Sequence, residues 1–210
     1  MSNERDLTGL PVNLLVRGRR VVVVGAGRIA VRKIASLLAL GAKVEVVAPS
    51  LSDEVRGWAA RGDVVVHERP FDPADLDGAW LAFTATDDPV VNAAVHASGE
   101  AAGVWVNSAD DPANCAFTLL SVVRRGDLVV SVGTGGRSPA LATHLRRRLD
   151  EELSGYEAVL DLLSEARERL KAAGRSSEDA DWKRAFDEGI VELVRAGRID
   201  DAKELLNTCL

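Results

Sequence analysis

The sequence predicts an α/β protein: a parallel sheet, then a β-hairpin with a helix, and finally a small helical domain. Three observations predict this order. Short apolar strands alternate with amphipathic helices over the first half of the chain. The alternation stops after Asn107, and apolar stripes at helical spacing fill residues 151–210.

The first strand is expected at Arg20–Val24, an apolar β-branched run typical of a strand buried on both faces. Residues 30–38 carry apolar side chains at helical spacing and predict a helix that Gly41 ends. The same patterns predict strands at 44–48, 64–66, 80–85 and 104–106, and helices at 51–61 and 89–102.

The second half begins with two strand-like runs, 117–123 and 128–132, whose separation by three charged residues and a glycine predicts a hairpin. Ser138-Pro139 supplies an N-cap and a first helical residue, so a helix is expected from there to about Leu153. We therefore expect a nucleotide-binding domain at 1–113, a hairpin-and-helix segment at 114–150 and a helical domain at 151–210.

Composition excludes several classes of protein. The 210 residues are 47% hydrophobic and 28% charged, as in ordinary globular proteins. A net charge of −6 argues against nucleic acid as a partner. No apolar run approaches the roughly 20 residues that span a bilayer, and the first residues lack a signal-peptide core, so we expect a cytoplasmic protein without a membrane partner. Cys115 and Cys209 are far apart, so neither a disulfide scaffold nor a metal cluster is expected.

Residues 25–30 form a GxGxxA motif that follows a strand and opens a helix. Gly25 permits the tight turn, Gly27 lets the backbone approach a pyrophosphate, and Ala30 is small enough for helix–strand packing. The helix N-terminus then faces the phosphates. This context predicts a Rossmann-type NAD-binding domain; the alternative is that the glycines serve only a tight turn.

The acidic residue that usually holds the ribose is missing, because the second strand ends in Ala48-Pro49-Ser50. Glu45 lies inside that strand and is expected to point elsewhere. No arginine stands there for a 2′-phosphate, so the residues alone leave NAD and NADP open. The expected cofactor-binding residues are Gly25, Gly27, Arg28, Ile29, Pro49, Ser50 and Thr86.

Four motifs in order carry a resemblance to a known family: residues 21–51 with GxGxxAxRK and Ala-Pro, TATDDPVVN at 84–92, VNSADDPANCAF at 106–117, and SVGTGGRSPALATHLRRRL at 131–149. Over essentially its whole length the chain resembles the precorrin-2 dehydrogenase and sirohydrochlorin ferrochelatase family, the N-terminal half of siroheme synthases. The resemblance implies NAD as cofactor and oxidation of precorrin-2, a tetrapyrrole, to sirohydrochlorin. Some members also insert ferrous iron, and that second activity stays open here.

The family's catalytic aspartate lies in a VNxxDxP motif, which maps onto Asp110, with Asp111 as the second candidate. A carboxylate after the fifth strand would stand at the carboxyl edge of the sheet, where a base could take the proton released by dehydrogenation. It could also draw a metal ion toward the tetrapyrrole. The alternative is that Asp110 only begins a turn with Pro112.

The glycine-rich stretch 131–139 can turn backbone N–H groups toward the tetrapyrrole carboxylates, unless it is only the end of a hairpin. Relatives often have Arg where this chain has Thr143, and Arg146, three residues on, is expected to replace it. The expected substrate-binding residues are Thr134, Gly135, Gly136, Ser138 and Arg146.

The hairpin is apolar on both faces, and a lone two-stranded hairpin is marginal in water, so it needs a cover. The family covers it with a partner subunit, which makes 114–150 a dimerisation segment and predicts a homodimer. The competing function is a regulatory NAD-sensing domain without catalysis. Such a domain would need GxGxxA but neither Asp110 nor the stretch 131–139.

Overall fold

The computed structural model describes residues 9–109 and 111–210, and the chain divides into two compact units, one ending at Leu119 and one spanning Leu120–Leu210. The N-terminal unit contains the following elements in chain order: β1 (Arg20–Val24), α1 (Arg28–Ala39), β2 (Lys43–Val47), α2 (Asp53–Arg61), β3 (Val64–His67), η1 (Pro73–Leu76), β4 (Leu81–Thr84), α3 (Pro89–Ala102), β5 (Trp105–Ser108) and η2 (Pro112–Asn114).

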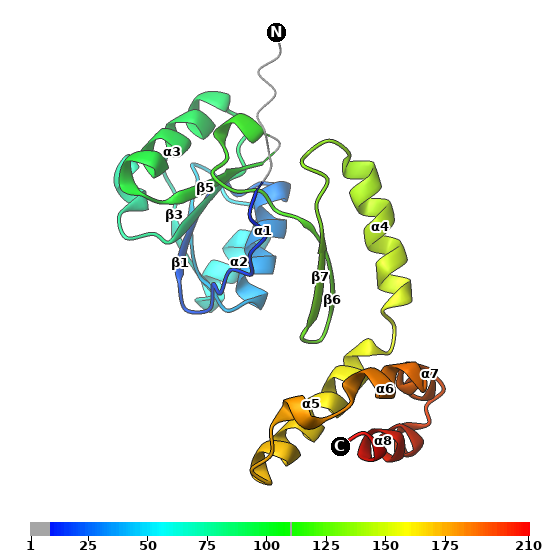
Figure 1. Ribbon diagram of the computed structural model, residues 1–210. Coiled ribbons are helices and arrows are strands. Elements are labelled where there is room, and N and C mark those ends of the chain that lie inside the picture. The colour runs from blue at the N-terminus through cyan, green and yellow to red at the C-terminus, as the bar shows by residue number, and fades with distance from the viewer. Residues whose placement is uncertain (1–8, 110) are drawn as a thin grey trace. The chain divides into compact units, whose positions relative to one another are not determined.

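The five strands form one parallel sheet in the order β3-β2-β1-β4-β5 (Figure 1). Central β1 pairs with β2 on one side and β4 on the other, so Val22 lies opposite both Glu45 and Ala82. The chain changes direction across the sheet at β1, and the carboxyl ends of β1, β2 and β4 therefore adjoin. The predicted α/β fold with a parallel sheet is confirmed.

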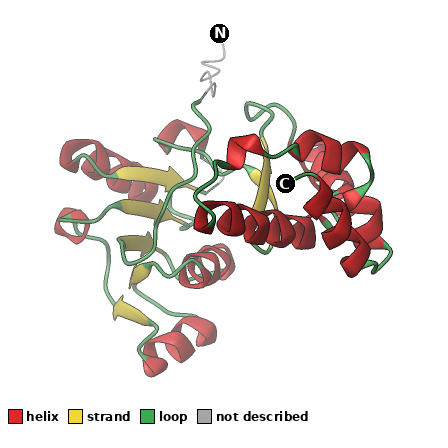
Figure 2. Cartoon of the chain, turned by 60° about the horizontal axis from the view of Figure 1, so that its bottom comes forward, coloured by secondary structure: helices red, strands yellow, loops and turns green. Residues whose placement is uncertain are grey.

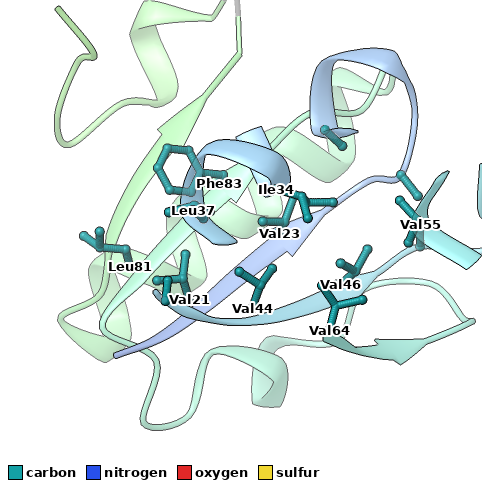
Figure 3. Packing of buried hydrophobic residues seen from close by; sticks show 14 of the residues in the cluster. Val21, Val23, Ile34, Leu37, Val44, Val46, Val55, Val64, Leu81 and Phe83 are labelled. Carbon is teal, nitrogen blue, oxygen red and sulfur yellow. The ribbon is translucent and has the colours of Figure 1, made fainter. Parts of the chain in front are cut away.

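Both faces of the sheet are buried because strand side chains alternate. On one face Val21, Val23, Val44 and Val46 pack against α1, where Ile34 is fully buried (Figure 3). On the other face the second apolar cluster joins the strands to η1 and α3; its members are Val22, Val24, Val47, Leu76, Ala82, Val95, Val104 and Val106. The near-continuous valine runs thus serve two cores at once.

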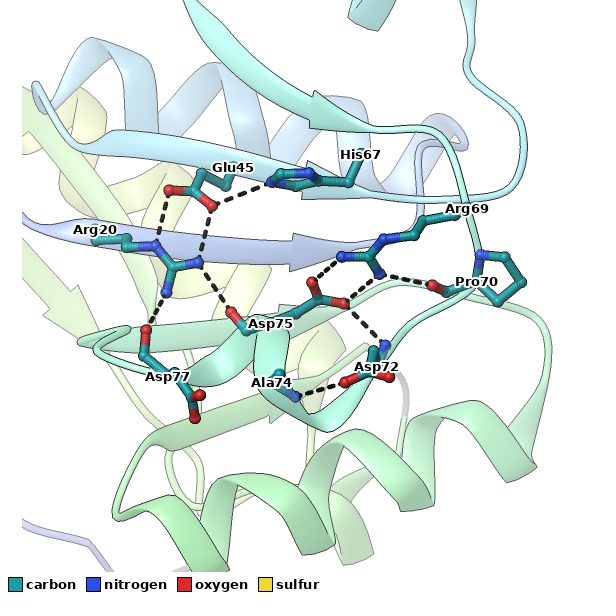
Figure 4. Close-up of polar contacts among 9 residues, drawn as sticks. All are labelled: Arg20, Glu45, His67, Arg69, Pro70, Asp72, Ala74, Asp75 and Asp77. Carbon is teal, nitrogen blue, oxygen red and sulfur yellow. Dashed lines mark hydrogen bonds and ion pairs between the residues drawn. The ribbon is translucent and has the colours of Figure 1, made fainter.

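Along the chain, β3 is connected to β4 by the short η1 and not by a full helix. A cluster of charged side chains from β1, β2, β3 and this connection lies here (Figure 4). The Arg20 guanidinium donates to both carboxylate oxygens of Glu45 at 2.8 Å and to the Asp75 carbonyl at 3.0 Å. His67 lies 3.4 Å from Glu45, and Arg69 pairs with the Asp75 carboxylate, which is 7% exposed. The Glu45 side chain therefore points into this cluster.

This cluster makes the stability of the N-terminal unit depend on pH. The hydrogen bond from Arg20 lowers the pKa of Glu45, and the hydrogen bond from Arg69 lowers the pKa of Asp75. A carboxyl whose pKa is lower in the folded than in the unfolded state contributes stability above its ordinary pKa. That contribution is lost as the pH falls through the lowered folded-state value.

We expect the Arg20→Met variant to have a lower free energy of unfolding than the wild type at neutral pH, because it leaves Glu45 without its main partner. The difference should shrink as the pH falls below about 4, where the ordinary carboxyl titrates. Urea unfolding at a series of pH values, followed by tryptophan fluorescence, measures it. A difference that stays constant with pH would show that the ion pair does not carry the effect.

The C-terminal unit contains β6 (Ser121–Arg125), β7 (Leu128–Val132), α4 (Pro139–Glu152), α5 (Tyr156–Ala172), η3 (Ser177–Asp179), α6 (Trp182–Asp187), α7 (Ile190–Arg195) and α8 (Ile199–Thr208), drawn by type in Figure 2. Strands β6 and β7 form the predicted antiparallel hairpin. Helices α5, α7 and α8 enclose a core of their own, in which Ala166, Ile190 and Leu206 are buried. The predicted hairpin and helical remainder are confirmed.

The expected start of the first hairpin strand at residue 117 is wrong, because β6 begins at Ser121. Phe117 belongs to the N-terminal unit instead, where its ring lies 5.5 Å from that of Phe83 in an edge-on contact. Its carbonyl oxygen accepts a hydrogen bond from the Asn107 side chain at 2.9 Å. The apolar run 117–123 therefore serves two units, which a pattern of hydrophobicity does not reveal.

Two arginines fasten the junction between α4 and α5. Arg125, at the end of β6, donates to the Asp150 carbonyl and pairs with the carboxylates of Asp150 and Glu157. Arg195, from α7, donates to the carbonyl of Ser154 at 2.8 Å and to that of Glu152. Two of the last carbonyls of α4, those of Asp150 and Glu152, are satisfied in this way.

Candidate functional site

The turn after β1 requires glycine at its first position. Gly25 has φ of 107°, in the left-handed region, and its N–H donates to the Val47 carbonyl at 2.9 Å. A Cβ on Gly25 would lie 2.5 Å from the Ala85 carbonyl oxygen. The turn thus passes closely between the ends of β2 and β4, as the tight turn of a dinucleotide site does.

The N-terminus of α1 is open and uncapped. Gly27 is the N-cap, no side chain caps its helix, and the first turn carries no acidic residue. A Cβ on Gly27 would meet nothing within 4 Å, whereas Ala30 one turn on is fully buried. Arg28 is exposed and Ile29 half-buried. The free first-turn N–H groups and the open space at Gly27 fit a pyrophosphate.

The other predicted cofactor residues lie on the two strands that flank β1. Pro49 and Ser50 follow β2 and are exposed. Thr86 follows β4, and its hydroxyl donates to the Asn92 side chain at 2.8 Å, while the Asn92 amide donates back to the Thr86 carbonyl at 3.2 Å. Since β2 and β4 both pair with β1, the structure brings all seven predicted cofactor residues to one edge of the sheet.

Buried polar side chains beneath this edge were not singled out from the sequence. Thr84 and Asn92 are hydrogen-bonded to each other, and Ser108 lies 3.4 Å from the Thr84 hydroxyl. All three are buried. One feature of the sequence could have indicated them: each lies in one of the motifs that carry the family resemblance, TATDDPVVN or VNSADDPANCAF.

The turn after β5 carries the predicted base. Asp110 lies outside the described residues. Asp111 is the N-cap of η2, and its carboxylate accepts a hydrogen bond from the Asn114 side chain at 2.6 Å. The Ala109 N–H donates to the Thr84 carbonyl at 2.9 Å, which ties this turn to the end of β4. The turn therefore stands at the same carboxyl edge as the glycine turn.

The predicted substrate residues belong to the C-terminal unit. Gly135 and Gly136 have φ of 58° and 75°, so the left-handed turn needs glycine there. The Thr134 hydroxyl lies within hydrogen-bond distance of the Ser138 carbonyl and N–H, and the Ser138 hydroxyl caps α4 by accepting from the Leu141 N–H at 3.2 Å. These two hydroxyls therefore stabilise the turn itself.

Arginines follow this turn along α4. Arg146 is half-buried, and Thr143, three residues before it, is exposed on the same helix. Within the described part of the chain, no ion pair engages any member of this set, which comprises Arg137, Arg146, Arg147 and Arg148. These guanidinium groups, one in the glycine-rich turn and three in the second half of α4, can attract a polyanionic ligand.

Residues 12–121 match a family described as "Putative NAD(P)-binding", which covers more than half of the chain and contains the whole glycine turn and sheet. The chain belongs to this NAD(P)-binding family. In the parts of the chain that the structure describes, no helix is long and apolar enough to cross a membrane, and no group of three metal-binding side chains gathers.

Curated relatives of this chain are named "Siroheme synthase". One from Nitrosococcus oceani is 35% identical over 204 residues, 96% of this chain and 44% of that protein. One from Chromobacterium violaceum is 39% identical over 195 residues, 92% of this chain and 41% of that protein. The chain thus spans less than half the length of these relatives. The resemblance that rested on four motifs is confirmed.

A solved structure named "SirC, precorrin-2 dehydrogenase" matches beyond the family region. It is 27% identical, with a TM-score of 0.75, and the match covers 96% of this chain and 98% of that one. The likeness therefore includes the hairpin and the C-terminal helices as well as the parallel sheet.

Proposed function

We propose that this chain catalyses the NAD-dependent dehydrogenation of precorrin-2 to sirohydrochlorin in siroheme biosynthesis. The match over nearly the full length of the solved precorrin-2 dehydrogenase carries the proposal. It supports an enzyme over a regulatory NAD sensor, because a sensor would need the glycine turn but not the hairpin, the glycine-rich turn before α4 and the helices that follow. The expected division at 113 and 150 and the cytoplasmic location remain predictions.

The glycine turn and the N-terminus of α1 would hold the cofactor. The first-turn N–H groups of α1 and its positive dipole end would bind the pyrophosphate beside Gly25 and Gly27. NAD, when bound, supplies the hydride acceptor. We favour NAD over NADP because the family that the chain resembles uses NAD, and the residues after β2, Pro49 and Ser50, are compatible with this choice because neither is basic.

The proposed base is Asp110. Dehydrogenation transfers a hydride to the nicotinamide ring and releases a proton, which a carboxylate near the substrate can accept. Its neighbours in sequence, Ala109 and Asp111, are hydrogen-bonded at the carboxyl edge of the sheet. Asp111, whose carboxylate is engaged by Asn114, is the second candidate.

The tetrapyrrole would bind through its carboxylates. Backbone N–H groups at Gly135 and Gly136, the N-terminus of α4 and the Arg146 guanidinium are the proposed partners, with Thr134 and Ser138 shaping the turn. Ferrous iron would be a substrate of a second reaction, insertion into sirohydrochlorin, which the resemblance leaves open. No observation favours that reaction over the first.

The decisive experiment mixes the protein, NAD and precorrin-2 and follows the absorbance of NADH and of the tetrapyrrole. We expect both to change together, one NADH for each sirohydrochlorin. If NAD binds but no NADH forms, the regulatory alternative replaces the proposed function. Supplying sirohydrochlorin and ferrous iron in a separate reaction shows whether iron insertion occurs.

We also propose a homodimer built largely on residues 114–150. In the C-terminal unit one face of the hairpin packs on α4, while Val122 and Val129 on the other face are 42% and 41% exposed. None of the described residues of α4 is fully buried. A hairpin with an uncovered apolar face is marginally stable alone, so a second copy would provide the cover.

We expect light scattering at micromolar concentration to give the mass of a dimer, and the Val122→Glu variant to shift it toward the monomer, because a carboxylate would be buried in the interface. Val65→Glu is the matched control, since Val65 is 55% exposed on β3 of the other unit. A wild-type monomer, or equal effects of both substitutions, would contradict the proposed interface.

A further inference from the structure

We infer that Asn107 is a positioning residue: its side chain ties the cofactor-binding helix α1 to the turn that carries the proposed base. The inference rests on the proposed function, because it assigns Asn107 a role in that reaction. Asn107 is the third residue of β5 and is only 6% exposed. Its amide points to partners on both sides, and these partners come from segments far apart in the sequence.

The first partner is on α1. The Lys33 ammonium donates to the Asn107 side-chain oxygen at 3.1 Å and lies 5.1 Å from the centre of the Phe83 ring. Lys33 belongs to the same helix whose N-terminus would bind the pyrophosphate. Because a hydrogen bond to a charged group is stronger than one between neutral groups, this contact links the position of Asn107 to that of α1.

The other partners follow the turn. The Asn107 side-chain amide donates to the Phe117 carbonyl at 2.9 Å and to the Cys115 sulfur at 3.6 Å. A buried amide deprived of its partners is costly, since it loses water without regaining hydrogen bonds. These contacts therefore hold residues 115–117 against the end of β5.

The Cys115 thiol links the two sides of this turn, Ser108 and Asp111. Its sulfur accepts from the Ser108 N–H at 3.2 Å and lies 3.3 Å from the carbonyl oxygens of Ser108 and Asp111. The Ala109 N–H is fixed to the Thr84 carbonyl. The backbone is thus held immediately before and immediately after position 110, and the thiol that joins the two sides is in contact with Asn107.

This arrangement has a catalytic consequence. A base must be held within about 0.5 Å of its productive position, and a misplacement of about 1 Å can cost a hundredfold in rate. Asn107 would supply this precision without touching the substrate. It would also set the distance between the proposed base and the cofactor, because its two sets of contacts reach the turn and α1.

The test compares three variants. Asn107→Leu keeps the number and branching of the side-chain atoms and removes every hydrogen bond of the amide. Lys33→Met removes the hydrogen bond from α1 to Asn107, together with the contact of the ammonium with the Phe83 ring. Val95→Ala is the control: Val95 is fully buried in the cluster on the opposite face of the sheet, so the variant loses stability without altering the contacts of Asn107. We expect kcat for precorrin-2 to fall about a hundredfold in Asn107→Leu and less in Lys33→Met.

The affinity for NAD, measured by calorimetry, should stay unchanged in both variants, and Val95→Ala should lower the melting temperature while keeping its kcat. If kcat falls in Asn107→Leu no further than in Val95→Ala, or falls together with NAD affinity, Asn107 is a structural residue and the inference is overturned.

Hydrogen exchange at the Ser108 amide separates this inference from the proposed function. We expect the Ser108 amide to exchange faster in Asn107→Leu than in the wild type, and at the wild-type rate in Val95→Ala. If the wild type does not oxidise precorrin-2, the proposed function fails, yet selective exchange at Ser108 still supports Asn107 as the group that holds the turn. Unchanged exchange in Asn107→Leu overturns the inference whatever the activity.

Discussion

Replacing Asp110 with Asn is expected to lower the turnover of precorrin-2 by about a hundredfold to ten-thousandfold, the usual cost of losing a general base. The amide has the shape of the carboxylate but cannot accept the proton. Binding of NAD should survive, because the phosphates would be held at Gly25 and Gly27, and binding of sirohydrochlorin should largely survive at the turn before α4. Steady-state kinetics and calorimetry on the same preparation measure both.

Asp111→Asn is the matched control for this prediction. It removes the neighbouring carboxylate, whose oxygen is already engaged by Asn114. If Asp110→Asn turns over at the wild-type rate, Asp110 is not the base, and a loss in Asp111→Asn would transfer the role. Iron insertion, assayed with sirohydrochlorin supplied directly, adds a second readout: if it falls as well in Asp110→Asn, one carboxylate serves both proton removal and metal delivery.

The Gly27→Asp variant is expected to bind NAD at least about a hundredfold more weakly, because a carboxylate would stand where the pyrophosphate approaches and like charges repel. Folding should not suffer. Gly27 has ordinary extended backbone angles, and a Cβ added there would meet nothing within 4 Å. Aspartate is also a favoured N-cap. The variant should therefore be as stable as the wild type, or more so, while its cofactor affinity is lost.

Gly27→Asn separates charge from bulk, since asparagine caps a helix equally well without the negative charge. We expect its affinity for NAD to lie between those of the wild type and Gly27→Asp. Calorimetry with NAD and thermal unfolding without it give the two quantities. A folded Gly27→Asp protein with unchanged affinity would place the pyrophosphate elsewhere.

Local patterns predicted most of the fold. Valine-rich runs mark β1 and β2, and Ser138-Pro139 marks the start of α4, because each of these signals depends on neighbours in sequence. The start of β6 could not be predicted in this way. Phe117 leaves the hairpin because it packs on Phe83, a contact between residues far apart in the chain, and hydrophobicity does not tell which unit an apolar residue joins.

The same distinction applies to the site. The glycine turn could be found from the sequence because Gly25, Gly27 and Ala30 act within one turn and its helix. Asn107 could not, because its partners Lys33 and Phe117 come from a distant helix and from the segment beyond η2. Its only sequence signal was membership in the motif that contains Asp110.

The arginine contacts at the end of α4 have a mechanical consequence. Arg125, from the hairpin, holds Asp150 near the end of α4 and Glu157 on α5, while Arg195, from α7, holds the carbonyls of Glu152 and Ser154. The end of α4 is therefore held by the hairpin and by α7, in addition to its covalent connection to α5. Arg147 and Arg148, which are exposed on α4, lie within about one helical turn of this anchored end, so a ligand bound to them would act on a part of the helix that is held in place.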